Sequence, residues 1–132
     1  MGLLSDIYHD SYYNCTIGNI PLHVDVLRTP EQQTKGYQGR SEPGPYEGLL
    51  FFYPATNKVG FWMKDVDFHL QLLAFDENDE LFQIINMQPN SQMIQMINRP
   101  CSKVVEVQRY WCQRNKITLG VKIQFDDAAG VL

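Results

Sequence analysis

The sequence has no two adjacent Lys or Arg residues, and its formal net charge at pH 7 is −4. Nucleic-acid binding needs a basic surface to meet the phosphates, so we expect no nucleic-acid partner. No segment is apolar over the roughly 20 residues that a membrane-spanning helix requires, so we expect no membrane partner. The N-terminal stretch MGLLSDIYHDSYYN lacks the basic and apolar regions of a secretory signal peptide. These absences predict a soluble, cytoplasmic protein.

Cysteine is also scarce, and the sequence has no CxxC pair. An odd number of cysteines, Cys15, Cys101 and Cys112, cannot all pair within one chain. This pattern suits a reducing compartment, so we expect all three thiols to be reduced and at least Cys101 or Cys112 to be buried. The histidines lie far apart and none has a partner at metal-ligand spacing. The sequence therefore predicts no metal site and no cofactor.

What the chain does contain is typical of a β-rich domain. Its 132 residues suffice for a single domain, residues 1–132, with a tail over residues 126–132. Hydrophobic residues make up 44% of the chain, and there are seven Tyr and seven Phe, which favours strands. We expect a mainly β (α+β) fold: one compact antiparallel β-barrel or curled sheet with one or two short helices.

Local signals place the first elements. Residues 19–27 alternate between apolar and polar side chains, which indicates a half-buried strand. Residues 12–19 are its expected hairpin partner, with Gly18 and Asn19 at the turn. Thr29 then begins a T-x-x-Q capping box before a helix of about two turns.

Pro30 occupies the first position of that helix and Gly36 ends it. Residues 39–48 hold too many Gly and Pro for a regular element and form a long loop of the kind that carries function. The rest of the chain is divided by turn signals, with a turn at 54–58, a hairpin loop at 76–80 and a helical turn at 109–116. Strands are predicted at 49–53, 59–64, 70–75, 81–87, 91–97, 103–108 (or the beginning of a short helix) and 118–125.

Four segments carry a family resemblance: TPEQQTKGYQGR, EGLLFFYP, GFWMKDVDFHLQLLAFDENDEL and KVVEVQ. In order and spacing they resemble the domain of unknown function 192 family, and the similarity covers about residues 22–125. The resemblance implies a compact β-rich domain with no settled activity. Many relatives look secreted, whereas this chain does not, which would suit a cytosolic or phage-borne variant in the host cytoplasm.

The chain departs from the family pattern at three places. Tyr37 stands where the family has Leu, although Arg40 is kept, and Asp65 and Val66 replace Asn and Thr. Gln71 replaces an Asp. An amide neither ionises nor acts as a general base, so a catalytic role of that Asp cannot transfer to this chain. The departures favour a structural or binding role over catalysis.

The candidate site is the surface around Arg40, Trp62 and Lys64. If residues 61–65 form a strand, Phe61, Met63 and Asp65 share the core face, while Trp62 and Lys64 lie on the opposite face. A tryptophan beside a cation is typical of a binding surface. Alternatively, Trp62 covers one end of the barrel and Arg40 pairs with Glu106 to hold the long loop. The predicted ligand-binding residues are Arg40, Trp62, Lys64, Asp65, His69 and Glu106.

Two function classes follow from these observations. The first is a non-enzymatic binding or accessory module for an unknown protein or small-molecule partner, working as a monomer or weak homo-oligomer. The second is a small hydrolase or lyase that uses Glu106 or His69 as its general base.

Overall fold

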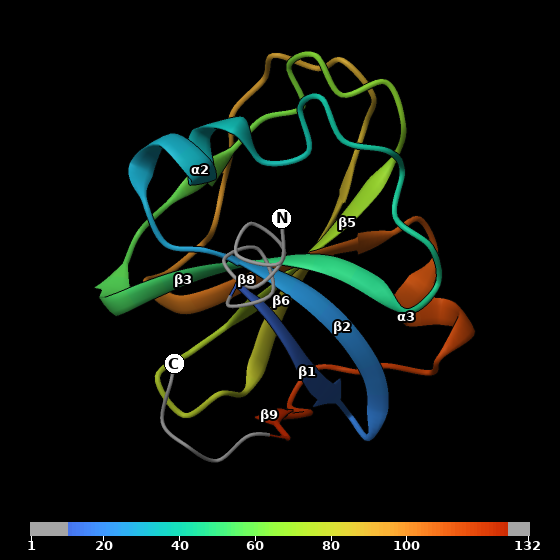
Figure 1. Cartoon of the computed structure of the whole chain (residues 1–132). Helices are drawn as coiled ribbons and strands as arrows, with labels where there is room; N and C mark the ends of the chain where they lie inside the picture. The colour runs from blue at the N-terminus through green and yellow to red at the C-terminus, as the bar shows by residue number, and fades with distance from the viewer. Residues whose placement is uncertain (1–10, 127–132) are drawn as a thin grey trace, which may run out of the picture.

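The computed structural model describes residues 11–126. Its strands are β1 (Tyr12–Ile17), β2 (Ile20–Leu27), β3 (Glu47–Asn57), β4 (Gly60–Phe61), β5 (Leu70–Phe75), β6 (Leu81–Met87), β7 (Gln95–Met96), β8 (Cys101–Gln108) and β9 (Ile123–Phe125). Two short helices, α2 (Pro30–Lys35) and α3 (Trp111–Arg114), complete the described part. A seven-stranded sheet in the order β6-β5-β8-β3-β2-β1-β9 curls around the centre of the molecule (Figure 1). β4 and β7 form a separate two-stranded sheet. The predicted mainly β fold with short helices is confirmed, whereas most of the expected tail lies outside the described residues.

The local predictions for the first third of the chain are confirmed. β1 and β2 pair as a hairpin, with Gly18 and Asn19 in the left-handed conformation at its turn. Helix α2 has the full capping box: the Thr29 hydroxyl accepts from the backbone N–H of Gln32, and the Gln32 side chain accepts from the N–H of Thr29. Gly36, with φ of 50°, ends the helix as expected.

The central strands are buried on both faces, which explains their continuous apolar runs. All six residues of β5 are buried, and β5 lies between β6 and β8. One face forms the Trp111 core: Cys15, Ile17, Leu22, Val24, Val26, Leu50, Leu73, Phe75, Leu81, Val105, Val107, Trp111, Cys112, Ile117 and Ile123. The other forms the Phe51 core: Leu27, Tyr37, Leu49, Phe51, Tyr53, Phe61, Met63, Val66, Leu70, Leu72, Ala74, Met87, Ile97, Cys101 and Val104.

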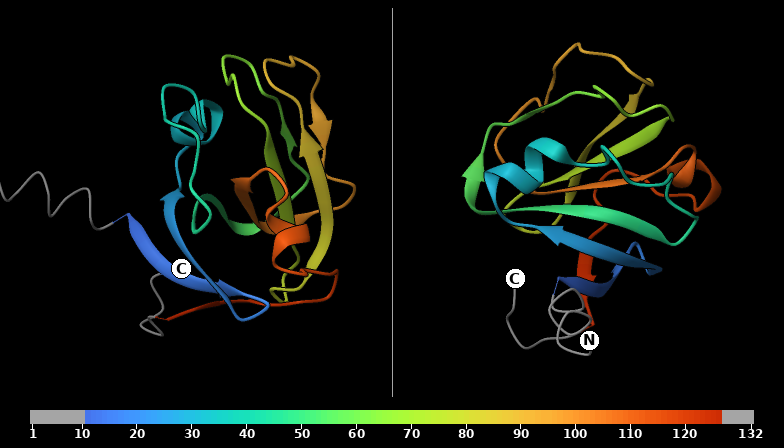
Figure 2. Two further views of the ribbon diagram at one scale, coloured as in Figure 1. Left: turned by 90° about the vertical axis from the view of Figure 1, so that its right-hand side faces the viewer. Right: turned by 45° about the horizontal axis from the view of Figure 1, so that its top comes forward.

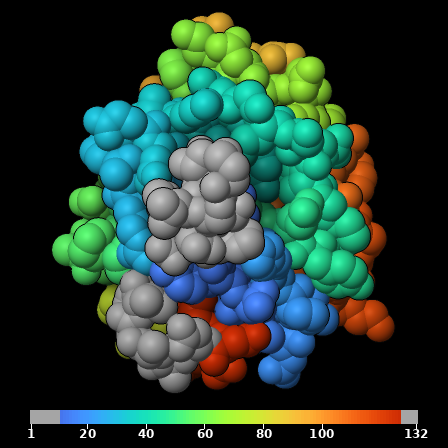
Figure 3. All heavy atoms as spheres, in the orientation of Figure 1, coloured from blue at the N-terminus to red at the C-terminus, as the bar shows by residue number. Residues whose placement is uncertain are grey.

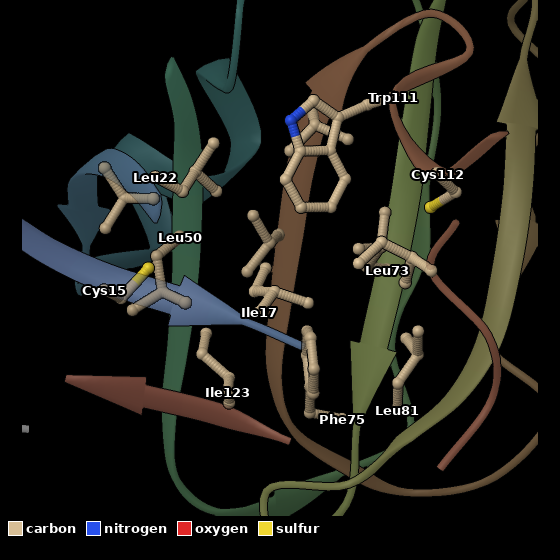
Figure 4. Packing of buried hydrophobic residues seen from close by; sticks show 14 of the residues in the cluster. Cys15, Ile17, Leu22, Leu50, Leu73, Phe75, Leu81, Trp111, Cys112 and Ile123 are labelled. Carbon is tan, nitrogen blue, oxygen red and sulfur yellow. The ribbon is translucent and has the colours of Figure 1, made fainter. Parts of the chain in front are cut away.

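The Trp111 core is continuous. In Figure 4 the labelled side chains from β1, β3, β5, β9 and α3 converge on one interior, with Trp111 at its edge. The Trp111 ring is fully buried, and its Nε1–H donates to the carbonyl of Pro45 at 2.8 Å. Cys15, Cys101 and Cys112 are free thiols and all are buried, so the prediction that at least Cys101 or Cys112 is buried is confirmed.

Three expectations need correction. The sheet is not antiparallel throughout, because β2 and β3 pair in parallel. Parallel strands need a crossover connection, and α2 with the loop over residues 36–46 supplies it. Residues 54–57, predicted as a turn, extend β3. The expected strand over residues 59–64 ends at Phe61, because the chain turns at Lys64 and Asp65, where Asp65 has φ of 58°.

Two further predicted strands are shorter than expected. Only Gln95 and Met96 of residues 91–97, and Ile123–Phe125 of residues 118–125, are strand. The other residues of the first segment form a loop at the same end of the molecule as α2 and residues 60–69, as the views in Figure 2 show. No helix within residues 11–126 is long and apolar enough to cross a membrane.

Candidate functional site

A cavity of about 390 Å³ opens between α2 and the segment that follows β3. The end of α2 contributes Lys35, and the next residues contribute Gly36 and Tyr37. Residues 59–64 form the opposite wall, which includes Phe61 and Trp62. Figure 3 shows residues 30–40 and 60–70 next to each other at the surface. The cavity thus lies over the Phe51 core, on the side of the sheet away from Trp111.

The inner wall of this cavity carries a buried carboxyl group, that of Glu106 in the middle of β8. Its cross-strand neighbours are apolar, Leu49 in β3 and Leu72 in β5. Glu106 is 3% exposed, and its Oε1 has no hydrogen-bond partner among the residues that the structure describes. Buried polar atoms are normally hydrogen-bonded, so this oxygen on the cavity wall could still form a hydrogen bond with a group in the cavity.

The protonation state of Glu106 follows from its surroundings. Burial in apolar surroundings raises the pKa of this carboxyl to about 8. The side chain is therefore mostly uncharged at pH 7 and can donate a hydrogen bond. Burial, and to a lesser extent the nearby Glu106, also raise the pKa of Tyr37 and Tyr53, so both phenols on the cavity wall are neutral.

Gly36 lies next to this carboxyl. A Cβ added at Gly36 would lie 3.7 Å from Glu106 Oε1 and 3.6 Å from the ring of Phe51. The φ of 50° at Gly36 is also unfavourable for residues with a side chain. Gly36 therefore both ends α2 and leaves space over the carboxyl.

Three of the predicted site residues, Trp62, Lys64 and Glu106, line the cavity. Trp62 is half-buried and Lys64 is exposed, with the Lys64 Nζ 5.4 Å from the Trp62 ring centroid. The lysine therefore sits beside the aromatic wall at the cavity mouth. The predicted exposure pattern of residues 61–64 holds even though they do not form a strand.

The other three predicted residues lie elsewhere. Arg40 does not pair with Glu106; its Nη2 is 2.9 Å from Oδ2 of Asp25, and the pair lines a separate hollow of about 160 Å³. The parallel pairing of β2 and β3 brings Asp25 next to the long loop, and the sequence gives no sign of that pairing. Asp65 is exposed in its turn and His69 is half-buried, and neither is part of the cavity wall.

Gln71, which replaces the family's Asp, has a structural role. It is 1% exposed, and its Nε2 donates to Asn86 Oδ1 and Gln113 Oε1, both at 2.9 Å. Its Oε1 accepts from the backbone N–H of Cys112 at 2.9 Å. The Gln71 amide therefore connects β5 to α3 through hydrogen bonds with Cys112 and Gln113.

Sequence reasoning missed Lys35, Gly36, Tyr37 and Tyr53 as parts of the site. Gly36 and Tyr37 had a usable signal, because they follow a well-capped helix and Tyr37 differs from the family pattern, but that signal does not reveal the side chain they face. No group of three or more His, Cys, Asp or Glu side chains within residues 11–126 could hold a metal ion.

Solved structures share the fold. A "putative transcription regulator" from Sinorhizobium meliloti 1021 superposes with a TM-score of 0.81 at 22% identity, over 86% of this chain and 93% of that one. A protein of unknown function from Novosphingobium aromaticivorans DSM 12444 gives a TM-score of 0.79 at 22% identity, over 86% and 84%. At this identity the similarity shows the fold alone. No curated protein matches the sequence significantly.

The family model called DUF192, described as an uncharacterized ACR, matches residues 14–125. That range includes every strand of the sheet except the first two residues of β1, together with the whole cavity. The match agrees with the resemblance carried by the Trp62–Met63 segment and its spacing from the Leu49–Tyr53 strand. This chain belongs to the DUF192 family.

Proposed function

We propose that this domain is a non-enzymatic binding module that takes a small molecule into the cavity beneath α2. The observation that carries the proposal is the unpartnered Oε1 of Glu106 on the cavity wall. A bound ligand with a polar atom at this position would supply the missing hydrogen bond.

The size and lining of the cavity support a small-molecule ligand. Its volume of about 390 Å³ lies within the range of roughly 300–1,000 Å³ that is usual for such sites. Aromatic rings from Phe51, Phe61 and Trp62 offer apolar area, and Glu106 offers a buried polar group beside the phenols of Tyr37 and Tyr53. Apolar walls with few polar groups are typical of specific small-molecule sites.

An exposed apolar strip extends the cavity mouth. Ile94 lines the cavity while remaining 60% exposed, and Met93 and Met96 beside it are 67% and 51% exposed. Flexible methionine side chains adapt to different ligand shapes. This strip would receive the part of a ligand that projects from the cavity.

The two tryptophans allow a direct test. In a fragment screen by ¹H–¹⁵N correlation spectra, ligands of the cavity should shift the indole N–H of Trp62 and leave that of Trp111 unchanged. Trp111 serves as an internal reference because its indole is buried in the opposite core and bonded to Pro45. Glu106→Leu should reduce the shifts at a given ligand concentration, because the hydrogen bond to the carboxyl is lost, whereas Arg40→Ala, in the separate hollow, should preserve them. A screen in which no fragment shifts Trp62 would refute the proposal.

One observation favours a second function, acid–base catalysis by Glu106. A carboxyl whose pKa is raised to about 8 by burial holds a proton that it can transfer near neutral pH. A hydrolase or lyase would use Glu106 as its general acid or base. The alternative in which His69 is the general base loses support, because His69 lies outside the cavity. Fragments that bind should be incubated with the protein and followed by NMR. If the protein converts a fragment to a product and Glu106→Gln abolishes this reaction, the domain is an enzyme that uses Glu106.

A further inference from the structure

The charged groups of the cavity have an unequal distribution. Among the described residues that line it, the charged types are Lys35, Lys64 and Glu106. Both lysines are exposed and so stand at the mouth, while Glu106 is buried at the inner wall. A ligand in the cavity would therefore lie close to the two lysines at the mouth and to the Glu106 carboxyl at the inner wall.

The inner carboxyl is a hydrogen-bond donor at neutral pH. Its neighbours across β3 and β5 are Leu49 and Leu72, which offer no counter-charge. The titratable side chains that line the cavity with Glu106 are Lys35, Tyr37, Tyr53 and Lys64. Cys101 lies near Tyr53, and Asp25, Arg40 and Glu47 lie near Tyr37, where Arg40 and Asp25 pair with each other. Burial raises the pKa of Cys101 to about 11 and that of both tyrosines further, so these three are neutral. The lysines are solvated, and burial instead raises the pKa of Glu106 to about 8.

Given a ligand-binding role for this cavity, on which this step rests, we infer that the ligand is a small organic acid with two oxygen groups. An anionic group, such as a carboxylate, lies at the mouth with Lys35 and Lys64. An uncharged acceptor, such as a ketone oxygen, reaches the unpartnered side of Glu106. The apolar part of the ligand contacts Phe51 and Phe61.

The same arrangement disfavours an organic cation. A cation would pass two lysines at the mouth and would then meet a carboxyl that is uncharged at pH 7. The Trp62 face, the natural platform for a cation, already holds Lys64, whose Nζ is 5.4 Å from the ring centroid. Both effects lower the affinity for amines relative to acids of the same size.

Four probes with one carbon skeleton separate these chemistries. 3-Benzoylpropionate carries both the carboxylate and the ketone, 4-phenylbutyrate lacks the ketone, butyrophenone lacks the carboxylate, and 4-phenylbutylamine carries a cation. Dissociation constants are measured from the shift of the Trp62 indole N–H at pH 7. We expect 3-benzoylpropionate to bind tightest, and loss of either oxygen group to weaken binding about fivefold, as is usual for one hydrogen bond or one exposed charge pair.

Variants assign each oxygen group to its partner. Lys35→Met and Lys64→Met should each weaken 3-benzoylpropionate and leave butyrophenone unchanged, while Lys58→Met, outside the cavity, should change neither. Raising the pH above about 8 removes the proton of Glu106, so binding of 3-benzoylpropionate should weaken. Glu106→Gln keeps a donor that does not titrate, so it should retain binding and lose this pH dependence.

Three outcomes would overturn the inference, and the third also overturns the binding function on which it rests. If 4-phenylbutylamine binds best, and more tightly as the pH rises, the ligand is a cation and only the ligand class is wrong. If none of the four probes shifts Trp62 while fragments of other chemistry do, the ligand class is again wrong and the binding function stands. If no fragment of any chemistry shifts Trp62, the binding function itself fails.

Discussion

Two buried polar side chains on adjacent strands, Gln71 in β5 and Glu106 in β8, meet opposite environments. Gln71 faces the Trp111 core, where its amide makes three hydrogen bonds. Glu106 faces the Phe51 core, where its Oε1 has no partner among the described residues and the packing leaves a cavity. A buried polar group whose hydrogen bonds are all formed stabilises the fold. A buried polar group without a partner lowers stability, which fits the proposed role of Glu106 in binding a ligand.

The largest expected effect tests whether the Trp111 side is the stability-determining core. Trp111→Ala should lower the free energy of unfolding by about 3–5 kcal/mol, because it removes a fully buried ring and its hydrogen bond to Pro45. Trp62→Ala is the matched control and should cost about 1 kcal/mol, because that ring is half-buried at a cavity mouth. Urea denaturation measures both. Equal losses would show that the two sides of the sheet contribute alike.

The next prediction concerns the two polar residues directly. Gln71→Leu should destabilise the protein by about 2–3 kcal/mol, because the Cys112 N–H and two side-chain amides lose their partner. Glu106→Leu should instead stabilise it by about 1–2 kcal/mol, since an apolar side chain replaces an unpaired carboxyl. Opposite signs in urea denaturation support the comparison. A destabilising Glu106→Leu would mean that this carboxyl contributes to the fold.

The pH dependence of stability should sharpen the result for Glu106. Its pKa rises from 4.5 to about 8 on folding, so between these values the native state binds more protons than the unfolded state. Stability from this group is complete below about pH 4.5 and is lost as the pH rises toward 8. Relative to Glu106→Gln, which does not titrate there, wild type should lose about 2 kcal/mol between pH 6 and pH 8. A constant difference would mean that the carboxyl is already ionised at pH 6.

The features that the sequence predicted correctly are local ones, which depend on residues close to one another in the chain. The capping box from Thr29 to Gln32 and the Gly18–Asn19 hairpin are local signals, and both occur as expected. The strand predicted over residues 59–64 was too long. Its alternating side chains fit a strand, but the chain turns at Lys64 and the left-handed Asp65, and the strand ends at Phe61. No Gly or Pro marks that turn, so pattern reasoning had no signal for it.

The site was only partly predictable because it joins distant segments. Glu106, Trp62 and Lys64 were named from the sequence, but their meeting with Tyr37 and Lys35 depends on β8 lying between β3 and β5. Strand order follows from packing of the whole chain, which no local pattern records. The predicted pairing of Arg40 with Glu106 was wrong for the same reason. Arg40 pairs with Asp25, because β2 lies parallel to β3, and the sequence does not reveal that strand pairing.

The smallest expected effect concerns Arg40, which lies outside both cores. Arg40→Ala should cost about 1 kcal/mol, since its guanidinium is partly exposed and the solvent screens the pair with Asp25. The loop over residues 41–46 should exchange its amide hydrogens faster, because the ion pair ties the loop to β2. Hydrogen exchange measured alongside urea denaturation tests both effects. Asp25→Asn is the control and should produce the same local change. Unchanged exchange in the loop would leave Arg40 without a structural role and return it to the candidate binding residues.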